Sequence, residues 1–348
     1  MIYRHVKIES CAMALPDEAV TSVELEERLA PLYRRLKLPE GRLEIMTGIR
    51  ERRVWPPGFK PSQASAAAGR AAIDKAGIDP AVIGCLIHCA VSRDYAEPAT
   101  STAVHRALGL ADTALNFDIS NACLGVLTGM MAVGNMIELG QIDCGLVVAG
   151  ESSRPLMEST IRELNENTAL TRRDIKPVFA SLTIGSAAAA VLLTRAASES
   201  DSGRLLGGAS LCNTAFNHLC QEDGGTGKNG SDHVLMKTDS EELLVRGVEV
   251  ARAAWREAKN ELGWCNETPD RVCTHQVGRI HRQRLYEALG LSAELDVSTV
   301  EFMGNCGSAS LPATMAHAEA TGQLKKGDRL ALLGIGSGIN CTMLGVEW

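Results

Sequence analysis

Short, almost wholly apolar runs alternate along this chain with longer stretches in which apolar residues recur at helical spacing. The runs are typical of strands in a sheet that is covered on both faces, and the periodic stretches are typical of amphipathic helices. Strands are predicted at 2–8, 81–92, 113–120, 144–152, 187–194, 271–276, 328–336 and 339–348, with a short one ending near Phe302. Helices are predicted at 23–36, 62–77, 100–108, 123–140, 238–263, 279–289 and 308–321. This order predicts an α/β fold with a buried sheet.

The two halves of the chain repeat one pattern of elements. Each half ends with a strand, a turn, a helix and a further strand, which is a weak duplication of pattern rather than of residue identity. Residues 46–61 are basic, aromatic and interrupted by prolines, so we expect a loop there. Residues 154–180 lack clear sheet periodicity and look like an insertion that closes the first half.

Composition narrows the class of protein. The chain has 348 residues, of which 45% are apolar and 22% charged, the balance of an ordinary globular protein. Its net charge of −7 argues against recruitment of nucleic acid or anionic lipid by an overall basic field. The first residues, MIYRHVKIES, lack the apolar stretch of a signal peptide, and no apolar run reaches the ~18 residues of a membrane span. We therefore expect a cytoplasmic protein with no membrane span.

Cysteine usage points to the same compartment. Eleven cysteines are present, but none form a CxxC pair and most lie in apolar runs. Buried free thiols behave as small apolar side chains and are typical of a reducing cytoplasm. No spacing of cysteines and histidines fits a metal site, so we expect none.

Cys123 is the candidate nucleophile. In FDISNACLGVLTGMM a buried strand ends at Ser120 and a helix begins around Cys123. The free N–H groups and the dipole of a helix N-terminus lower the pKa of a thiol and can hold an oxyanion on an acyl group attached to the sulfur. A thiolate there suits thioester exchange. The alternative is that Cys123 is one more structural cysteine.

His275 and Asn305 are the candidate partners in the second half. His275 ends an apolar strand in VCTHQVGRIH, where a neutral imidazole can donate to a thioester carbonyl or exchange a proton. Asn305 lies in the glycine-flanked turn of FMGNCGSASLP, and its amide can offer an N–H to the same carbonyl. Each also has an ordinary explanation, as a structural histidine and as a turn residue.

NACLGVLTGM, THQVGRIH, MGNCGSASLP and LLGIGSGINCTM together resemble the thiolase superfamily, in its ketoacyl-synthase III branch. The resemblance spans the chain and implies the thiolase fold, with two similar βαβαβαββ halves in α-β-α-β-α layers. Residues 1–180 would hold the nucleophile and a cap insertion, and residues 181–348 the histidine and asparagine.

The same resemblance implies roles for the site residues. Cys123 would be the nucleophile, and His275 and Asn305 would form one oxyanion site. The backbone N–H groups of Cys123 and Gly338 would form the other.

Within that branch, AVSRDYAEPATSTAV and HQVGRIH are similar to the long-chain acyl-CoA thiolases of bacterial olefin biosynthesis. Such enzymes join two acyl-CoAs in a Claisen condensation without decarboxylation, so a general base must remove an α-proton. The resemblance implies that Glu97 is this base, contributed by the neighbouring subunit of a homodimer, with a pKa raised by the apolar acyl tunnel. The alternative is that Glu97 simply precedes a helix at Pro98.

Two positions depart from the ketoacyl-synthase III pattern. Gly278 stands where those enzymes have an asparagine, a position at which the olefin-type enzymes also differ from them, and Met46 stands where they have an arginine for coenzyme A phosphate. Phosphate contacts would then come from other basic residues, namely Arg50, Arg52, Arg53 and Arg279. Such arginines are also common as plain solvated charge.

The expected substrates are long-chain acyl-CoA thioesters, with no tightly bound cofactor. Three alternatives stay open at this point: a ketoacyl synthase that uses a malonyl thioester, a thiolase-fold acyltransferase, and a catalytically silent subunit. The sequence leaves open whether the protein docks to downstream pathway enzymes.

Overall fold

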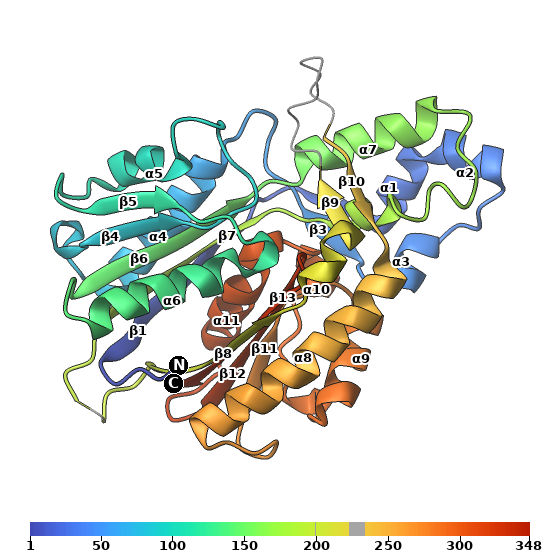
Figure 1. The fold of residues 1–348 in the computed structure, drawn as a ribbon. Helices are drawn as coiled ribbons and strands as arrows, with labels where there is room; N and C mark the ends of the chain where they lie inside the picture. The colour runs from blue at the N-terminus through green and yellow to red at the C-terminus, as the bar shows by residue number, and fades with distance from the viewer. Residues whose placement is uncertain (199, 223–233) are drawn as a thin grey trace.

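The computed structural model describes residues 1–198, 200–222 and 234–348 (Figure 1). Its strands are β1 Val6–Ala14, β2 Ala19–Thr21, β3 Glu51–Arg53, β4 Cys85–His88, β5 Leu115–Asp118, β6 Cys144–Glu151, β7 Ala187–Arg195, β8 Arg204–Cys212, β9 Cys220–Glu222, β10 Met236–Thr238, β11 Arg271–Thr274, β12 Arg329–Gly336 and β13 Asn340–Glu347. Its helices are α1 Ser22–Arg28, α2 Ala30–Leu36, α3 Arg42–Thr47, α4 Pro61–Ala76, α5 Thr100–Leu108, α6 Gly125–Glu138, α7 Arg154–Glu166, α8 Ser240–Leu262, α9 Arg279–Leu289, α10 Val300–Met303 and α11 Ser310–Ala320.

Nine strands form a continuous mixed sheet in the order β11-β12-β13-β8-β1-β7-β6-β4-β5. The first four strands in this order, β11 to β8, come from the second half of the chain. The other five, β1 to β5, come from the first half. Within the ladder, β1 and β8 are joined through one residue pair, Lys7 with Arg204. The sheet therefore consists of two smaller sheets that meet along β1 and β8.

Helices separate and cover the two parts of the sheet, as Figure 1 shows. Helices α4 and α5 lie on the outer face of the first part, and α8 and α9 on the outer face of the second. Helices α6 and α11 lie between the two parts and contact strands of the first, while α11 also contacts β11 of the second. The result is the five-layer α-β-α-β-α arrangement that the sequence predicted.

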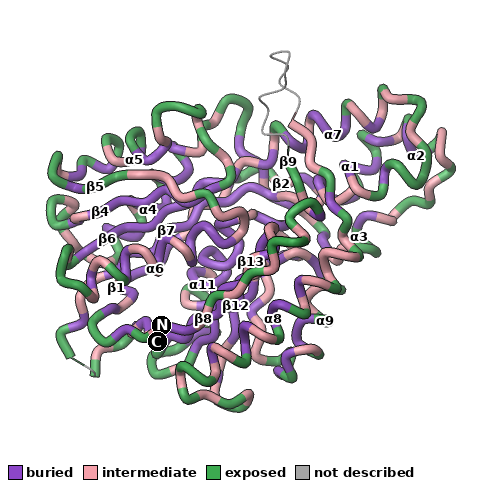
Figure 2. Tube along the Cα trace, in the orientation of Figure 1, coloured by how far each residue is buried: buried purple, intermediate pink, exposed green. Residues whose placement is uncertain are grey.

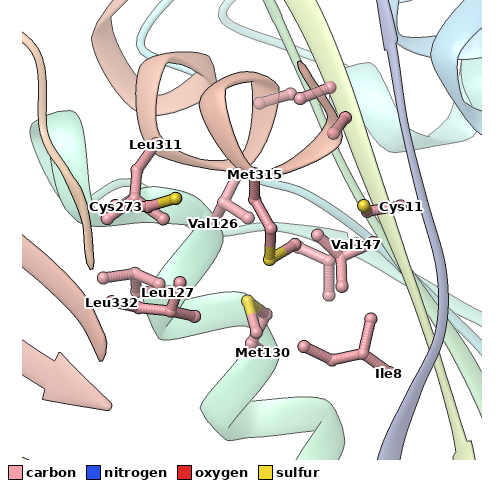
Figure 3. Packing of buried hydrophobic residues seen from close by; sticks show 14 of the residues in the cluster. Ile8, Cys11, Val126, Leu127, Met130, Val147, Cys273, Leu311, Met315 and Leu332 are labelled. Atoms are coloured by element: carbon pink, nitrogen blue, oxygen red, sulfur yellow. The ribbon is translucent and has the colours of Figure 1, made fainter. Parts of the chain in front are cut away.

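Buried apolar residues form one cluster under the outer helices of each part of the sheet and one central cluster between the two parts, and the purple segments in Figure 2 follow them. The central cluster packs α6 against α11 (Figure 3). Met130 of α6 and Met315 of α11 approach each other there beside Val147 of β6 and Ile8 of β1. Met130 is therefore a core residue, which is the ordinary use of methionine in irregular space.

The two halves share one element order. The first runs β1-α4-β4-α5-β5-α6-β6-β7, which is the predicted βαβαβαββ unit. The second runs β8-α8-β11-α9-α11-β12-β13, and the counterpart of β5 is reduced to an isolated bridge between Val272 and Asp296. Because β7 pairs with β1 and β6, we propose that the boundary between the halves lies between β7 and β8 rather than at residue 180.

A helical cap rises over one end of the sheet. Thr21 and Glu24 close a capping box at the start of α1, and Pro31, which lacks an N–H, opens the separate helix α2. The expected insertion at 154–180 begins with α7, whose buried side chains pack with those of α1 and α2 into a fourth apolar cluster. The insertion and the N-terminal helices therefore form one unit (Figure 1).

Several predicted elements were wrong in extent or kind. The first strand begins at Val6 rather than residue 2 and runs to Ala14, because it pairs along its length with β7. The expected loop at 46–61 contains β3, which pairs with β2, and the expected strand near Phe302 is helix α10. The sequence also missed β8. Its Gly207 and Gly208 lie so close to the carbonyls of Met1 and Met343 that no Cβ fits.

Candidate active site

Cys123 lies in a single 3-10 turn, Ala122–Leu124, between β5 and α6. Ala122 has a φ of 45°, a left-handed conformation that costs a residue with a side chain about 1–3 kcal/mol. The Leu124 N–H donates to the Asn121 carbonyl at 2.9 Å and closes the turn. The α-helix then begins at Gly125 rather than at Cys123. The half-buried Cys123 thus lies ahead of the helix on a strained turn.

The thiol of Cys123 is protonated at neutral pH. Burial raises its pKa to about 12, and the neighbouring Cys220 and Glu151 add to the effect. A hydrogen bond from its own N–H acts in the opposite direction. The sequence predicted a lowered pKa, and this was wrong because withdrawal of a thiolate from water outweighs the partial charge of the turn. The nucleophile therefore needs a base.

His275 directly follows β11. Strand β12 lies between it and the turn that carries Cys123. Its N–H donates to the Leu333 carbonyl of β12 at 3.1 Å. On the next residue of β12, Gly334, a Cβ would come within 2.4 Å of Leu124 Cδ2. Strand β12 thus borders both segments and brings His275 and Cys123 to the same end of the sheet.

The imidazole of His275 is held neutral. Burial lowers its pKa to about 4, and the nearby His281 adds to the shift. Its Nδ1 is shielded from solvent and has no hydrogen-bond partner among the described residues. A neutral ring with a free nitrogen can accept the proton of a thiol or donate to a carbonyl, depending on its tautomer.

Asn305 is buried and its side chain is oriented. Its N–H donates to the Thr183 carbonyl and its carbonyl accepts from the Gly185 N–H, both at 2.9 Å. Its Oδ1 accepts from the Gly307 N–H at 3.0 Å. Within the described part of the chain, Nδ2 makes no hydrogen bond, so this N–H₂ group remains available to a ligand carbonyl.

The β12–β13 hairpin closes the other side of the cysteine turn. Asn340 Nδ2 donates to Asn121 Oδ1 at 3.2 Å, two residues before Cys123. A Cβ on Gly336 would lie 3.5 Å from the Cys123 nitrogen, so a glycine lets this backbone approach closely. Gly338 lies in the hairpin with a φ of 131°. The hairpin thus lies beside Cys123, where the sequence placed the second backbone donor.

Glu97 lies apart from this group in the single chain. It is exposed, and no hydrogen bond or ion pair joins it to Cys123, His275 or Asn305 in the described residues. The segment that carries it is nevertheless fixed, because Asp94 accepts from the Ser62 N–H at 2.9 Å. Glu97 is thus an exposed side chain on a segment that is held in place at Asp94.

The arginines at 52 and 53 are engaged within the protein. Arg52 is 1% exposed and donates to the Val20 carbonyl and the Ser22 hydroxyl at 3.2 Å, and burial lowers its pKa to about 10. Arg53 pairs with Glu51 at 3.0 Å. Arg52 is therefore closed to an external phosphate, and Arg53 is already engaged with a carboxylate.

Arg50 and Arg279 are both exposed, and the segment that leads to Arg50 packs against Arg279. Arg279 donates to the Ile45 carbonyl at 3.3 Å, and a Cβ on Gly48 would lie 3.1 Å from Arg279 Cβ. Of the four arginines that the sequence suggested, these two keep a phosphate-binding role open.

Comparison with known proteins identifies the family of this chain. Residues 46–200 match the family model of the thiolase N-terminal domain, and residues 260–348 match that of the 3-oxoacyl-[acyl-carrier-protein] synthase III C terminus. The chain is 40% identical over its whole length to the whole acyl-CoA:acyl-CoA alkyltransferase of Shewanella oneidensis, and 36% identical over the same extent to that of Xanthomonas campestris. The chain belongs to the acyl-CoA:acyl-CoA alkyltransferase family.

Solved structures confirm the thiolase fold for this member of the alkyltransferase family. Cerulenin-bound Xanthomonas campestris OleA matches 100% of this chain and 98% of that one, with a TM-score of 0.94 and 36% identity. A second structure of that enzyme, with a cysteine replaced by serine and with lauric acid and lauroyl-CoA bound, matches 99% of this chain and 100% of that one at a TM-score of 0.93. Other structures carry substitutions at a glutamate or a histidine.

Glu151 is a buried residue of this alkyltransferase-family site to which the sequence gave no role. It ends β6, and its carboxylate accepts the N–H groups of Val91, Ser92 and Ser308 at 2.9–3.0 Å. The signal in the sequence is one acidic residue at the end of the otherwise apolar run CGLVVAGE. A buried carboxylate there requires partners, and the sequence does not name them.

None of the helices that the structure describes has the length and apolar character needed to cross a bilayer. All eleven cysteines lie within the described residues and are free thiols. Seven of them are buried, as expected for cysteines in apolar runs.

Proposed function

We propose that this protein condenses two acyl-CoA thioesters head to head, without decarboxylation, through an acyl group held on Cys123. The observation that carries the proposal is that the segments of Cys123, His275 and Asn305 adjoin, through β12 and through the Ser308–Val126 hydrogen bond, in a chain that is 40% identical to an acyl-CoA:acyl-CoA alkyltransferase. The product is a 2-alkyl-3-ketoacyl compound, as the thioester or as the free acid, and is a precursor suited to olefin formation.

In the first half-reaction the Cys123 sulfur attacks the thioester carbonyl of one acyl-CoA. The neutral His275 ring takes the thiol proton, since the thiol is not ionised by itself at neutral pH. The tetrahedral oxyanion accepts hydrogen bonds from the backbone N–H groups of Cys123 and Gly338. The carbon–sulfur bond to coenzyme A breaks, the leaving thiolate takes the proton, and the acyl group stays on the enzyme.

In the second half-reaction a base removes an α-proton from another acyl-CoA. The enolate oxygen accepts from His275 and from the free Nδ2 of Asn305, and the α-carbon attacks the acyl-cysteine carbonyl. A carbon–carbon bond forms and the Cys123 thiolate leaves. We assign the base role to Glu97. Xanthomonas campestris OleA has been solved with a glutamate, a histidine and a cysteine substituted, which are the residue types proposed here.

We propose that Glu97 reaches the site of a second copy of this chain in a homodimer. Strand β5 is the edge of the sheet and its Leu115 is 55% exposed. The segment that carries Glu97 presents two more exposed apolar side chains, Val91 and Tyr95. An edge strand flanked by apolar surface favours pairing with a like edge across a two-fold axis.

Arg50 and Arg279 are the proposed contacts for the coenzyme A phosphates. Both are exposed and their segments adjoin, so a nucleotide can lie between them. We expect no further cofactor. The eleven free thiols support a reducing compartment such as the cytoplasm.

The test is incubation of the purified protein with one long-chain acyl-CoA and nothing else, followed by extraction and mass spectrometry. Formation of a 2-alkyl-3-keto product supports the proposal, and so does the ketone left when its thioester is hydrolysed by water and the resulting β-keto acid loses carbon dioxide. If product forms only when a malonyl thioester is added, with release of carbon dioxide, the protein is a ketoacyl synthase instead. Cys123→Ala is the matched control in both arms.

A further inference from the structure

The carboxylate of Glu151 lies where the separate segments of the site meet. Its Oε1 accepts the Val91 N–H at 2.9 Å and the Ser308 N–H at 3.0 Å, and its Oε2 accepts the Ser92 N–H at 3.0 Å. The side chain is 5% exposed. Each of these three backbone N–H groups would otherwise need another acceptor, because a buried donor without one costs about 1–3 kcal/mol.

The three donors belong to two functional segments. Val91 and Ser92 begin the segment that ends at Glu97, and the Ser92 hydroxyl also accepts the Ser152 N–H at 3.0 Å. Ser308 belongs to the turn after Asn305. The carboxylate also lies flat against Gly307, where a Cβ would come within 2.9 Å of Oε1, so the turn has no room for a side chain there.

A third segment is reached through Ser308. Its hydroxyl accepts the Val126 N–H at 3.0 Å, in the first turn of α6 after Cys123. Glu151 is therefore connected by an unbroken series of hydrogen bonds to the segments that carry Glu97, Asn305 and Cys123. These segments come from both halves of the chain and have no other common polar side chain in the described residues.

We propose that Glu151 is the positioning residue that fixes the Glu97 segment relative to Asn305 and Cys123. The inference rests on the proposed function, and it adds a residue that touches neither substrate nor the reacting atoms. Burial raises the pKa of this carboxyl group, and the three backbone N–H groups oppose that rise because they stabilise the ionised form, which only accepts hydrogen bonds. Ionised acceptors also form shorter and stronger bonds with backbone N–H groups than neutral ones do.

Glu151→Gln tests this with almost no change in size. An amide has one accepting oxygen, so its N–H₂ group must face at least one backbone donor. The orientation that loses fewer bonds places the N–H₂ group at the Oε2 position, against the Ser92 N–H, and keeps the bonds to Val91 and Ser308. The segment that carries Glu97 thereby loses one of its two bonds to residue 151, while the Asn305 turn and the start of α6 stay held.

The experiment measures the two half-reactions separately. Acylation of Cys123 by a long-chain acyl-CoA is followed by intact mass, and condensation by product formation. We expect condensation by Glu151→Gln to fall at least tenfold while acylation stays within about threefold of wild type. Amide hydrogen exchange should rise at Ser92 and stay unchanged at Val126.

Asp296→Asn is the matched control. The Asp296 carboxylate is also buried, and it accepts from the Tyr286 hydroxyl at 2.6 Å and pairs with Arg282, outside the Glu151 network. We expect this variant to lose thermal stability while keeping the wild-type ratio of condensation to acylation. If Glu151→Gln lowers both half-reactions in the same proportion, or neither, Glu151 has no positioning role.

Two further measurements keep the inference testable. If Glu151→Gln does not fold, Glu151→Asp is used, which keeps an accepting carboxylate but retracts it by one methylene; condensation should again fall more than acylation. Iodoacetamide alkylation of Cys123, followed by peptide mass spectrometry, should titrate at lower pH in Glu151→Gln, since a nearby negative charge is removed. An unchanged profile would contradict the placement. A wild-type protein that acylates but never condenses would instead overturn the proposed function.

Discussion

The Ser308 hydroxyl accepts a hydrogen bond from the Val126 N–H at 3.0 Å, and this bond joins the turn after Asn305 to the first turn of α6. The first N–H groups of a helix have no partner within it, and here a side chain from the other half of the chain supplies one. The relative position of Cys123 and Asn305 therefore depends on a hydroxyl that does not touch the substrate.

Ser308→Ala removes this acceptor and leaves the buried Val126 N–H unpaired. We expect a loss of about 1–3 kcal/mol in the free energy of unfolding. Acylation should slow, because the turn that carries Cys123 is no longer tied to Asn305. Thr321→Ala is the control, since it removes an exposed hydroxyl directly after the end of α11, far from the Ser308 turn. Wild-type acylation by Ser308→Ala would show that the bond does not position the nucleophile.

Glu97→Ala separates the two half-reactions. The acyl group should still transfer to Cys123, because that step uses His275, while condensation should fall by about 10²–10⁴-fold, as is usual when a general base is removed. Intact mass reports the first step and product formation the second. Glu44→Ala, which removes an exposed carboxylate from α3, is the control. Equal loss of both steps in Glu97→Ala would count against its assignment as the base.

The two proposed phosphate contacts predict a change in KM rather than in kcat. Arg279→Ala and Arg50→Ala should each raise the KM for acyl-CoA several-fold, since each removes a charge that binds the ground state and the transition state alike. Arg53→Ala is the control, because Arg53 is already paired with Glu51. With an acyl-pantetheine substrate, which lacks the nucleotide phosphates, the variants should match wild type. A KM effect that persists on acyl-pantetheine would place these arginines elsewhere.

Burial of His88 makes the free energy of unfolding depend on pH. It is 1% exposed, neither ring nitrogen has a hydrogen-bond partner among the described residues, and burial lowers its pKa to about 4 despite Asp118 at 3.8 Å. Between pH 6.5 and 4 the unfolded chain binds a proton that the folded chain does not, so stability falls as the pH falls through this range.

The comparison of wild type with His88→Leu isolates this contribution. The slope of unfolding free energy against pH between 4 and 6.5 should be smaller in the variant by up to one proton, about 1.4 kcal/mol per pH unit. Urea unfolding at several pH values measures the slope. Parallel curves for the two proteins would mean that His88 is protonated in the folded state as readily as in the unfolded one.

Long apolar and amphipathic segments were predictable from the sequence. Helices α5 and α9 begin and end at the predicted residues, because glycines at 109 and 290 end them in the left-handed conformation. The extents of β1 and β4 were not predictable, because pairing with β7 and β6 rather than local pattern decides them. Strand β8 was missed because its glycines serve the close approach of neighbouring backbone, which a propensity argument reads as a loop.

The site divides in the same way. Cys123, His275 and Asn305 were singled out from motifs, since each lies in or beside a turn with a recognisable sequence. The pKa of Cys123 could not be predicted from the sequence, because it depends on burial and on Cys220 and Glu151, which are distant in the sequence. Arg52 was misplaced for the same reason. Its basic neighbours suggested a surface loop, whereas β3 turns the side chain into the protein.

The central claim is that the thiol of Cys123 carries the acyl group, and intact-protein mass spectrometry after incubation with a long-chain acyl-CoA tests it most directly. We expect one acyl adduct per chain, located by peptide mapping at Cys123 and absent in Cys123→Ala. A protein that remains unmodified, or an adduct that maps to the exposed Cys212 or Cys265, would contradict the account.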